Sequence, residues 1–299
     1  MQGRISRRGK AIRTDGILAL RADPYTYTKL LVKLEVRDQV RDAGYELLFF
    51  LGGVGAGGNG LTLREMGEAL LAGVGARFER EKLERIRKRG LVEGPEAGLG
   101  GVLRVTALGK AAFDGGRAVE EAWGRGWDGR WRLLAFDLPR HATQSRVRFW
   151  RWLRANYFGR LQGSVWVSPD PPSGLDEAMA AADLETSKVV LFSGEVTGGL
   201  GAGGIAAGGW DFDAINSGYI EYAGFADGAA RQHDRKPPTA PRLRELLRED
   251  RRRWWAAVRR DPLLPESLHP EGYEGPRAWE ARCHLLRRLR KHVGLGNPD

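Results

Sequence analysis

Residues 76–89 read ARFEREKLERIRKR and are followed directly by Gly90-Leu91-Val92-Glu93. Seven residues of this stretch are Lys or Arg and three are Glu. Leu83 and Ile86 have the spacing of one helix face, so that face can pack while the charged face stays in solvent. The stretch predicts a cationic helix that ends at a glycine and leads into a short apolar strand.

The neighbouring segments predict a larger motif around this helix. Residues 36–51 predict a helix, and Thr62 with Glu65 forms the capping box of a second helix over 63–71. After the cationic helix, a glycine-rich turn at 95–101 leads into a second strand at 102–106. This order is typical of a winged helix-turn-helix, in which the cationic helix enters the major groove of DNA. The alternative is a solvated surface helix with mixed charges.

A DNA contact would use the basic side chains of this motif, because Lys and Arg neutralise phosphates and reach base edges. The candidates for DNA binding are Arg77, Arg80, Lys82, Arg85, Arg87, Lys88, Arg89 and Arg104. The first three lie near the start of the helix and are candidates for base contacts. The later ones are expected to touch the phosphate backbone or solvent.

Composition limits the partners and the compartment. The chain has 299 residues, a formal charge of +10 and a pI of about 10.0. This charge favours a polyanionic partner, most simply nucleic acid, with an anionic membrane surface as the alternative. Cys283 is the single cysteine, and no apolar run is long enough to span a bilayer. We therefore expect a cytoplasmic protein without an intrachain disulfide or a membrane span.

The middle of the chain alternates predicted strands and helices. Strands are expected over 131–138, 161–168 and 188–196, and helices over 142–157 and 175–184. This alternation predicts an α/β sandwich of ferredoxin-like size. Glycine and alanine dominate 198–209, which we predict to be a flexible loop.

The predicted fold class is α+β, with four successive parts. A basic N-terminal arm covers 1–35, a winged-helix domain 36–123, a ferredoxin-like domain 124–230 and a C-terminal helical domain 231–299. The winged-helix domain should end in a helix over 108–123. The last part should contain an arginine-rich helix over 242–260 and a final helix over 277–292.

Four stretches resemble one known family, the PaaX transcriptional repressors of phenylacetate degradation. They are the predicted helix-turn-helix with its wing, WDGRWRLLAFDLPR at 127–140, LQGSVWVSP at 161–169 with WDFDAIN at 210–216, and DPLLPESLHPEGYEGPRAWE at 261–280. The resemblance implies a central domain similar to Cas2. It also implies a homodimeric repressor that an aryl- or acyl-CoA, such as phenylacetyl-CoA, releases from double-stranded operator DNA. The chain departs from the family in a wing at 98–105 with one arginine and no aromatic residue, and in an expanded 198–209 segment.

An acyl-CoA effector needs cations for its phosphates and an apolar pocket for its acyl group. The candidate effector residues are Trp150, Trp166, Arg251, Trp254 and Trp255, and we expect the ligand between the central and C-terminal domains. Ordinary core packing is the competing interpretation for each tryptophan.

Enzyme chemistry has weaker support in the sequence. Asp137 ends a predicted strand where a Cas2-like dimer would place a metal-binding carboxylate, so a metal-dependent nuclease is the alternative function. Glycines at 53–58 and 199–204 fit GxGxxG, but neither has the strand, turn and helix that a dinucleotide site needs. We predict a non-enzymatic regulator without a cofactor or a resident metal.

Overall fold

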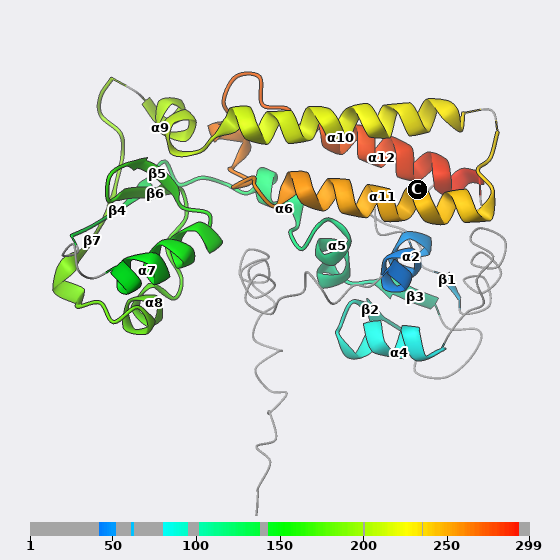
Figure 1. Ribbon diagram of the computed structural model, residues 1–299, viewed down its shortest axis with the longest axis horizontal. Helices are drawn as coiled ribbons and strands as arrows, with labels where there is room; N and C mark the ends of the chain where they lie inside the picture. The colour runs from blue at the N-terminus through cyan, green and yellow to red at the C-terminus, as the bar shows by residue number, and fades with distance from the viewer. Residues whose placement is uncertain are drawn as a thin grey trace, which may run out of the picture.

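The computed structural model describes residues 42–51, 61–62, 80–94, 102–137, 143–199, 201–234 and 236–292. Three long helices lie side by side, a sheet domain sits at one end of them, and the N-terminal elements pack beneath the other end (Figure 1). The predicted α+β class is confirmed, because these residues form many helices and two antiparallel sheets. The expected arm at 1–35 lies outside the described residues. No described helix is long and apolar enough to cross a membrane.

The first part of the chain, here called the N-terminal unit, combines short helices with a small sheet. Its strands pair antiparallel in the order β1-β3-β2, with Leu61 opposite Leu103 and Glu93 opposite Arg104. In chain order the unit consists of α2 (Asp42–Phe50), β1 (Leu61–Thr62), α4 (Arg80–Lys88), β2 (Val92–Glu93), β3 (Val102–Val105), α5 (Ala107–Phe113) and α6 (Val119–Gly124). The helix predicted over 63–71 lies outside the described residues, as does the first part of the one predicted over 36–51.

The single helix predicted over 108–123 is wrong, because the chain forms α5 and α6 with a break between them. Gly115 and Gly116 adopt φ values of 96° and 84°, which a regular helix does not allow. Thr106 caps α5 by accepting a hydrogen bond from the Gly109 N–H at 3.0 Å. A Cβ on Gly109 would lie 2.0 Å from the Leu91 carbonyl oxygen, so glycine lets α5 press directly on the chain beside β2.

The central domain is a four-stranded antiparallel sheet in the order β5-β6-β4-β7. Its elements are β4 (Trp131–Phe136), α7 (Thr143–Ala155), β5 (Gly159–Gln162), β6 (Val165–Ser168), α8 (Leu175–Ala181), η4 (Thr186–Lys188), β7 (Val189–Gly194) and α9 (Gly201–Gly209). This β-α-β-β-α-β sequence is that of a ferredoxin-like fold. The single strand predicted over 161–168 is wrong: Gly163, at φ 49°, turns the chain so that β5 and β6 form a hairpin.

The sheet has a separate apolar core on each face. Leu134, Phe136 and Trp166 pack with Phe149 and Leu153 of α7 on one face. Trp131 and Val167 point to the other face, where they meet Ala206 of α9 and Leu264 and Leu268 from a later segment. This alternation follows the two-residue period of strands, and it means that both faces are covered.

The predicted flexible loop at 198–209 is wrong, because residues 201–209 form helix α9. Small residues are needed there, since a Cβ on Gly159 of β5 would lie 2.9 Å from the Gly209 carbonyl oxygen. Close packing against β5 therefore compensates for the poor helix propensity of glycine. The helix begins inside the second GxGxxG match, but the preceding β7 runs antiparallel to β4, unlike the strands of a dinucleotide-binding unit.

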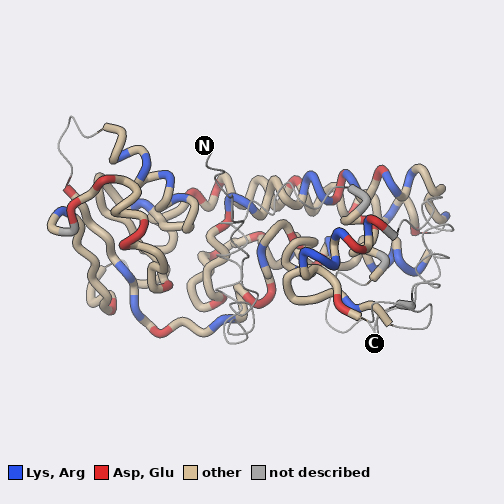
Figure 2. The backbone as a smooth tube through the Cα atoms, turned by 90° about the horizontal axis from the view of Figure 1, so that it is seen from below, with Lys and Arg blue, Asp and Glu red and all other residues tan. Residues whose placement is uncertain are grey.

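The C-terminal part is a helical bundle of α10 (Phe212–Gln232), α11 (Ala240–Val258) and α12 (Gly275–His292), with a short turn η5 (Glu266–Leu268). Its apolar residues form one continuous core with those of α2, α4, α5 and α6. The predicted boundary at residue 230 falls inside α10, which packs against α11 and α12 rather than against the sheet. Basic positions occur along these helices as well as in α4 (Figure 2).

Candidate nucleic-acid interface

Helix α4 is the element that the sequence marks for DNA binding. Leu83 and Ile86 are buried in the core shared with α2, as their spacing predicts. Arg85 and Lys88 are exposed, together with Glu81 and Glu84. The helix therefore presents a face of mixed charge to solvent, and its apolar face holds it in the unit.

The end of α4 is fixed by a glycine in the left-handed region. Gly90 has φ 70°, its N–H donates to the Arg87 carbonyl at 2.8 Å, and the Leu91 N–H donates to the Ile86 carbonyl at 3.0 Å. These two bonds are those of a Schellman motif, which ends a helix and satisfies its last carbonyls. Leu91 and Ile86 share the core, so the chain leaves the helix directly into β2.

The predicted basic residues of α4 do not all have the same environment. Arg87 donates to the Gly94 carbonyl and lies 3.5 Å from a Glu84 carboxylate oxygen, so its guanidinium joins the helix to the segment after β2. Lys82 and Arg89 are half-buried and have further interactions. Arg77 and the Arg80 side chain lie outside the described part of the chain. Arg85 and Lys88 are thus the two exposed candidates on the described helix.

Arg104 lies on β3, beside the helix in the same unit. Its side chain is exposed and stands opposite Glu93 in the β2–β3 register. The residues between these strands, 95–101, are outside the described ranges, and so is the tip of the predicted wing. Arg104 can add one cation to the surface of α4, but its neighbour Glu93 offsets that charge.

A buried charged cluster attaches the N-terminal unit to the bundle. Arg282 of α12 is completely buried, and its guanidinium lies 2.6 Å from Asp114 and 3.5 Å from Asp250. It also donates at 3.0 Å to the hydroxyl of Tyr45 in α2, which itself donates to Asp250. Tyr222 of α10 donates to the same carboxylate. The cluster joins four helices from distant parts of the sequence.

Burial controls the protonation of this cluster. Desolvation raises the pKa of Asp114 to about 7, although Arg282 favours the charged carboxylate. Burial also raises the pKa of Tyr45 and Tyr222 above their ordinary range, and so does the nearby Asp250. The tyrosines thus remain neutral donors to Asp250. Sequence periodicity contained a signal for this site, because Asp250 and Arg282 fall on the otherwise apolar stripes of their helices.

The structure does not bring the five candidate effector residues together. Trp150 and Trp166 stand 6.4 Å apart between their ring centroids in the core of the central domain. Trp254 is buried in the bundle, where its Nε1 donates to the Asp114 carbonyl at 2.9 Å. Arg251 lies 4.7 Å over the ring of Trp255 on the same helix. The two groups occupy different cores, so they do not line one pocket.

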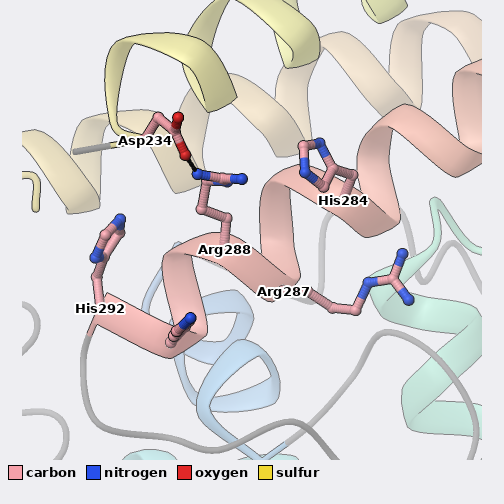
Figure 3. Close-up of a pocket in the computed structure, with 6 residues that line it drawn as sticks. Asp234, His284, Arg287, Arg288 and His292 are labelled. Atoms are coloured by element: carbon pink, nitrogen blue, oxygen red, sulfur yellow. Dashed lines mark ion pairs between the residues drawn. The ribbon is translucent and has the colours of Figure 1, made fainter. Parts of the chain in front are cut away.

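A pocket of about 460 Å³ does occur elsewhere, on the outer side of α12. Figure 3 shows Arg288 reaching to Asp234, with His284 and His292 on either side of this pair. None of these residues is among the predicted site residues. Their signal was the helical spacing of basic side chains near the end of the chain.

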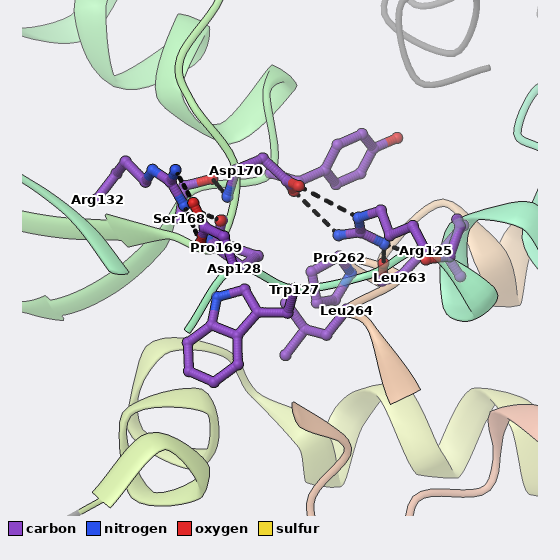
Figure 4. A network of polar contacts seen from close by, with 12 residues as sticks. Arg125, Trp127, Asp128, Arg132, Ser168, Pro169, Asp170, Pro262, Leu263 and Leu264 are labelled. Atoms are coloured by element: carbon purple, nitrogen blue, oxygen red, sulfur yellow. Dashed lines mark hydrogen bonds and ion pairs between the residues drawn. The ribbon is translucent and has the colours of Figure 1, made fainter. Parts of the chain in front are cut away.

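The junction between the central domain and the bundle is occupied by protein side chains. Arg125 forms two bonds with the Asp170 carboxylate, at 3.2 and 3.0 Å, and donates to the Leu263 carbonyl at 2.6 Å (Figure 4). Arg132 lies nearby and binds Asp128 at 2.8 Å and the Pro169 carbonyl at 2.6 Å. These contacts tie the chain before β4 to the segment after β6 and to the turn before α12.

Asp137 follows β4 directly and is exposed. Its backbone N–H donates to the Lys188 carbonyl at 3.1 Å. Within the described ranges, no group of three or more His, Cys, Asp or Glu side chains is placed to hold a metal ion. A single protomer therefore offers one carboxylate for the nuclease alternative.

The chain is similar to known proteins in the sequence of its central domain and in its overall fold. Residues 124–203 match the family model of the PaaX protein central Cas2-like domain. The uncharacterized protein Rv0674 from Mycobacterium tuberculosis has a similar structure, with a TM-score of 0.50 and 19% sequence identity. That match covers 83% of this chain and 95% of that one and shows a shared fold. No curated protein matches this chain. Residues 124–203 are thus similar to the central Cas2-like domain of PaaX proteins.

Proposed function

We propose that this protein is a sequence-specific DNA-binding transcription regulator. The observation that carries the proposal is the arrangement of the N-terminal unit, in which α4 presents Arg85 and Lys88 beside the antiparallel sheet β1-β3-β2. A helix, a short strand, a cationic helix and two strands follow one another in this unit, and this order supports a winged helix. In this proposal α4 is the recognition helix and β2 and β3 flank the wing.

The family of the central domain supports the more specific parts of the proposal. We infer a cytoplasmic homodimer that represses transcription and leaves its double-stranded operator when an acyl-CoA such as phenylacetyl-CoA binds. A dimer suits DNA because two recognition helices would read half-sites one helical turn, or a multiple, apart. A ligand can shift this equilibrium only if it binds the DNA-free state more tightly than the bound state.

The role proposed here is non-enzymatic. Catalysis on a phosphodiester by Mg²⁺ would require several oxygen ligands around the ion. Asp137 would have to supply them together with a second protomer. Incubating the protein with DNA and Mg²⁺ or Mn²⁺ tests this alternative, and cleavage that disappears in Asp137→Ala would overturn the non-enzymatic role.

The decisive experiment is a binding titration with the promoter region next to the protein's own gene, in excess non-specific DNA. We expect specific binding that weakens as salt rises and is lost when phenylacetyl-CoA is added. The double variant Arg77→Ala/Arg80→Ala should lose the specific component. The matched control Arg259→Ala/Arg260→Ala removes two exposed cations directly after α11 and should retain it. Equal binding of promoter and random DNA would overturn the proposal.

A further inference from the structure

The outer face of α12 carries a row of basic side chains. The row consists of His284, Arg287, Arg288, Lys291 and His292. Counted from His284, the other four lie three, four, seven and eight residues later, which places all five on one side of a helix. All five line the pocket of about 460 Å³, and among the described residues that line it Asp234, just after α10, is the single acid. A helix rises about 1.5 Å per residue, so the row extends over roughly 12 Å.

Among the described residues that line this pocket, basic side chains outnumber acidic ones. Arg288 forms an ion pair with Asp234, which joins α12 to the connection between α10 and α11. Arg287 bonds through its Nε to the Cys283 carbonyl at 3.2 Å, and this leaves its terminal nitrogens for a ligand. In the ranges that the structure describes, no carboxylate pairs with Arg287 or Lys291. His292 is held by a 2.6 Å contact between its Nε2 and the His233 carbonyl.

From this geometry we propose that the pocket binds a small ligand with more than one phosphate group, and that the ligand replaces Asp234 as the partner of Arg288. Arginine forms paired, charge-assisted bonds to phosphate oxygens, and lysine adds a point charge beside them. The volume lies within the range of small-molecule sites. The proposal does not depend on DNA binding, because α4 and this pocket occupy different elements.

Because the ligand would replace Asp234 beside Arg288, substitutions of acidic and of basic residues in the pocket should change phosphate affinity in opposite directions. A carboxylate next to the site competes with a phosphate for the same guanidinium. Removing its charge should strengthen phosphate binding, whereas neutralising Arg287 and Lys291 should weaken it. An electrostatic surface without a defined site would respond to each change only through the net charge.

Binding is measured by isothermal titration calorimetry of the full chain, first with inorganic pyrophosphate and then with ADP. We expect saturable binding of pyrophosphate, at least about tenfold weaker in Arg287→Gln/Lys291→Gln, since a charge-assisted bond contributes roughly one order of magnitude in affinity. Asp234→Asn should bind several-fold more tightly. Arg259→Gln/Arg260→Gln, which removes the same two charges elsewhere, should bind like the unmodified protein.

The two probes distinguish the sources of phosphate. Equal affinity for both indicates a site that reads phosphates alone, and tighter binding of ADP indicates a nucleotide-type ligand. Thermal melting of each variant verifies that the fold is intact. Pyrophosphate binding that is unchanged in Arg287→Gln/Lys291→Gln would overturn the proposal. It would also be overturned if neither probe bound and the same substitutions lowered the affinity for random duplex DNA, because the row would then be a DNA contact.

Discussion

The N-terminal unit and the central domain are joined to the helical bundle in different ways. The N-terminal unit shares an apolar core with α10, α11 and α12, and the buried Arg282 cluster crosses that boundary. The central domain has a core of its own between its sheet and α7 and α8. It meets the later chain through the smaller cluster around Leu264 and Leu268 and through Arg125.

This difference separates the molecule into two units of stability. Elements that share a core and a buried charge cluster should open together, because the opening of either exposes the same apolar surface. The central domain can open at its junction without disturbing the core between its sheet and α7 and α8. The proposed recognition helix α4 therefore belongs to the same unit of stability as the bundle, whereas the central domain forms a second unit.

The largest expected effect comes from removing the cation at the centre of the shared core. Arg282→Met would leave Asp114 and Asp250 buried without their positive partner, which costs about 3–5 kcal/mol for such pairs. Urea unfolding should show this loss, and hydrogen exchange should show faster opening in α2 as well as in α12. The control Arg259→Met, at an exposed position, should change neither quantity. A loss below about 1 kcal/mol would mean that the cluster does not hold the two parts together.

The next effect concerns the pH dependence of the same cluster. The pKa of Asp114 is raised in the folded protein to about 7, whereas the pKa of an unfolded Asp is about 3.9. The folded state therefore holds this proton more tightly. Its contribution to stability is complete below about pH 4 and is lost as the pH rises to about 7.

Asp114→Asn removes this titration and resembles the protonated side chain. The difference in unfolding free energy between the variant and the unmodified protein should shift by about 2–4 kcal/mol between pH 4 and pH 7.5, in favour of the variant at the higher pH. Denaturant titrations at a series of pH values measure it. A constant difference across this range would show that Asp114 is ionised throughout.

A smaller effect is expected at the junction of the central domain. Arg125→Ala would leave Asp170, which is largely buried, without its bidentate partner, at a cost of about 1–3 kcal/mol. Hydrogen exchange should increase at the amides of Asp170, Leu263 and Leu264, while α2 and α12 remain protected. Arg160→Ala, at an exposed position of the same domain, is the control. Increased exchange throughout the bundle would contradict the separation into two units.

The smallest effect concerns DNA affinity at the surface of α4. If Arg85 and Lys88 contact phosphates, Arg85→Gln and Lys88→Gln should each reduce the slope of log affinity against log salt by about 0.9. Arg87→Gln should act more on stability, because its guanidinium bonds to the Gly94 carbonyl. Fluorescence anisotropy at several salt concentrations measures the slopes. An unchanged slope in both exposed variants would place the DNA elsewhere on the molecule.

Local patterns were sufficient to predict α4 and its end. The Leu83–Ile86 spacing and Gly90 identify a buried face and a stop that depend on a few adjacent residues. The alternation of strands and helices likewise predicted the central domain. Its hairpin was missed, because a single tight turn at Gly163 divides the stretch that was predicted as one strand.

The predictions that were wrong concern segments whose structure depends on residues far away in the sequence. Glycine-rich residues 201–209 resemble a loop by composition, yet they form a helix because β5 approaches them too closely for side chains. The tryptophans of the predicted effector site could not be assigned to a pocket or a core by composition, and they belong to two separate cores. Arg282 could have been identified from its place on an apolar stripe, but its partners come from three other helices.

The core shared by the first and last parts of the chain also affects how the protein is made. On the ribosome, α2 emerges early, whereas its partners in α11 and α12 are completed more than a hundred residues later. At about 5–20 residues per second, the apolar face of α2 is exposed for on the order of ten seconds or more before residue 292 is added. The central domain is contiguous and can fold during that interval. The proposed DNA-binding part would thus be synthesised before the central domain, but its core would be completed only after the bundle helices are added. Until then its exposed apolar surface is open to aggregation.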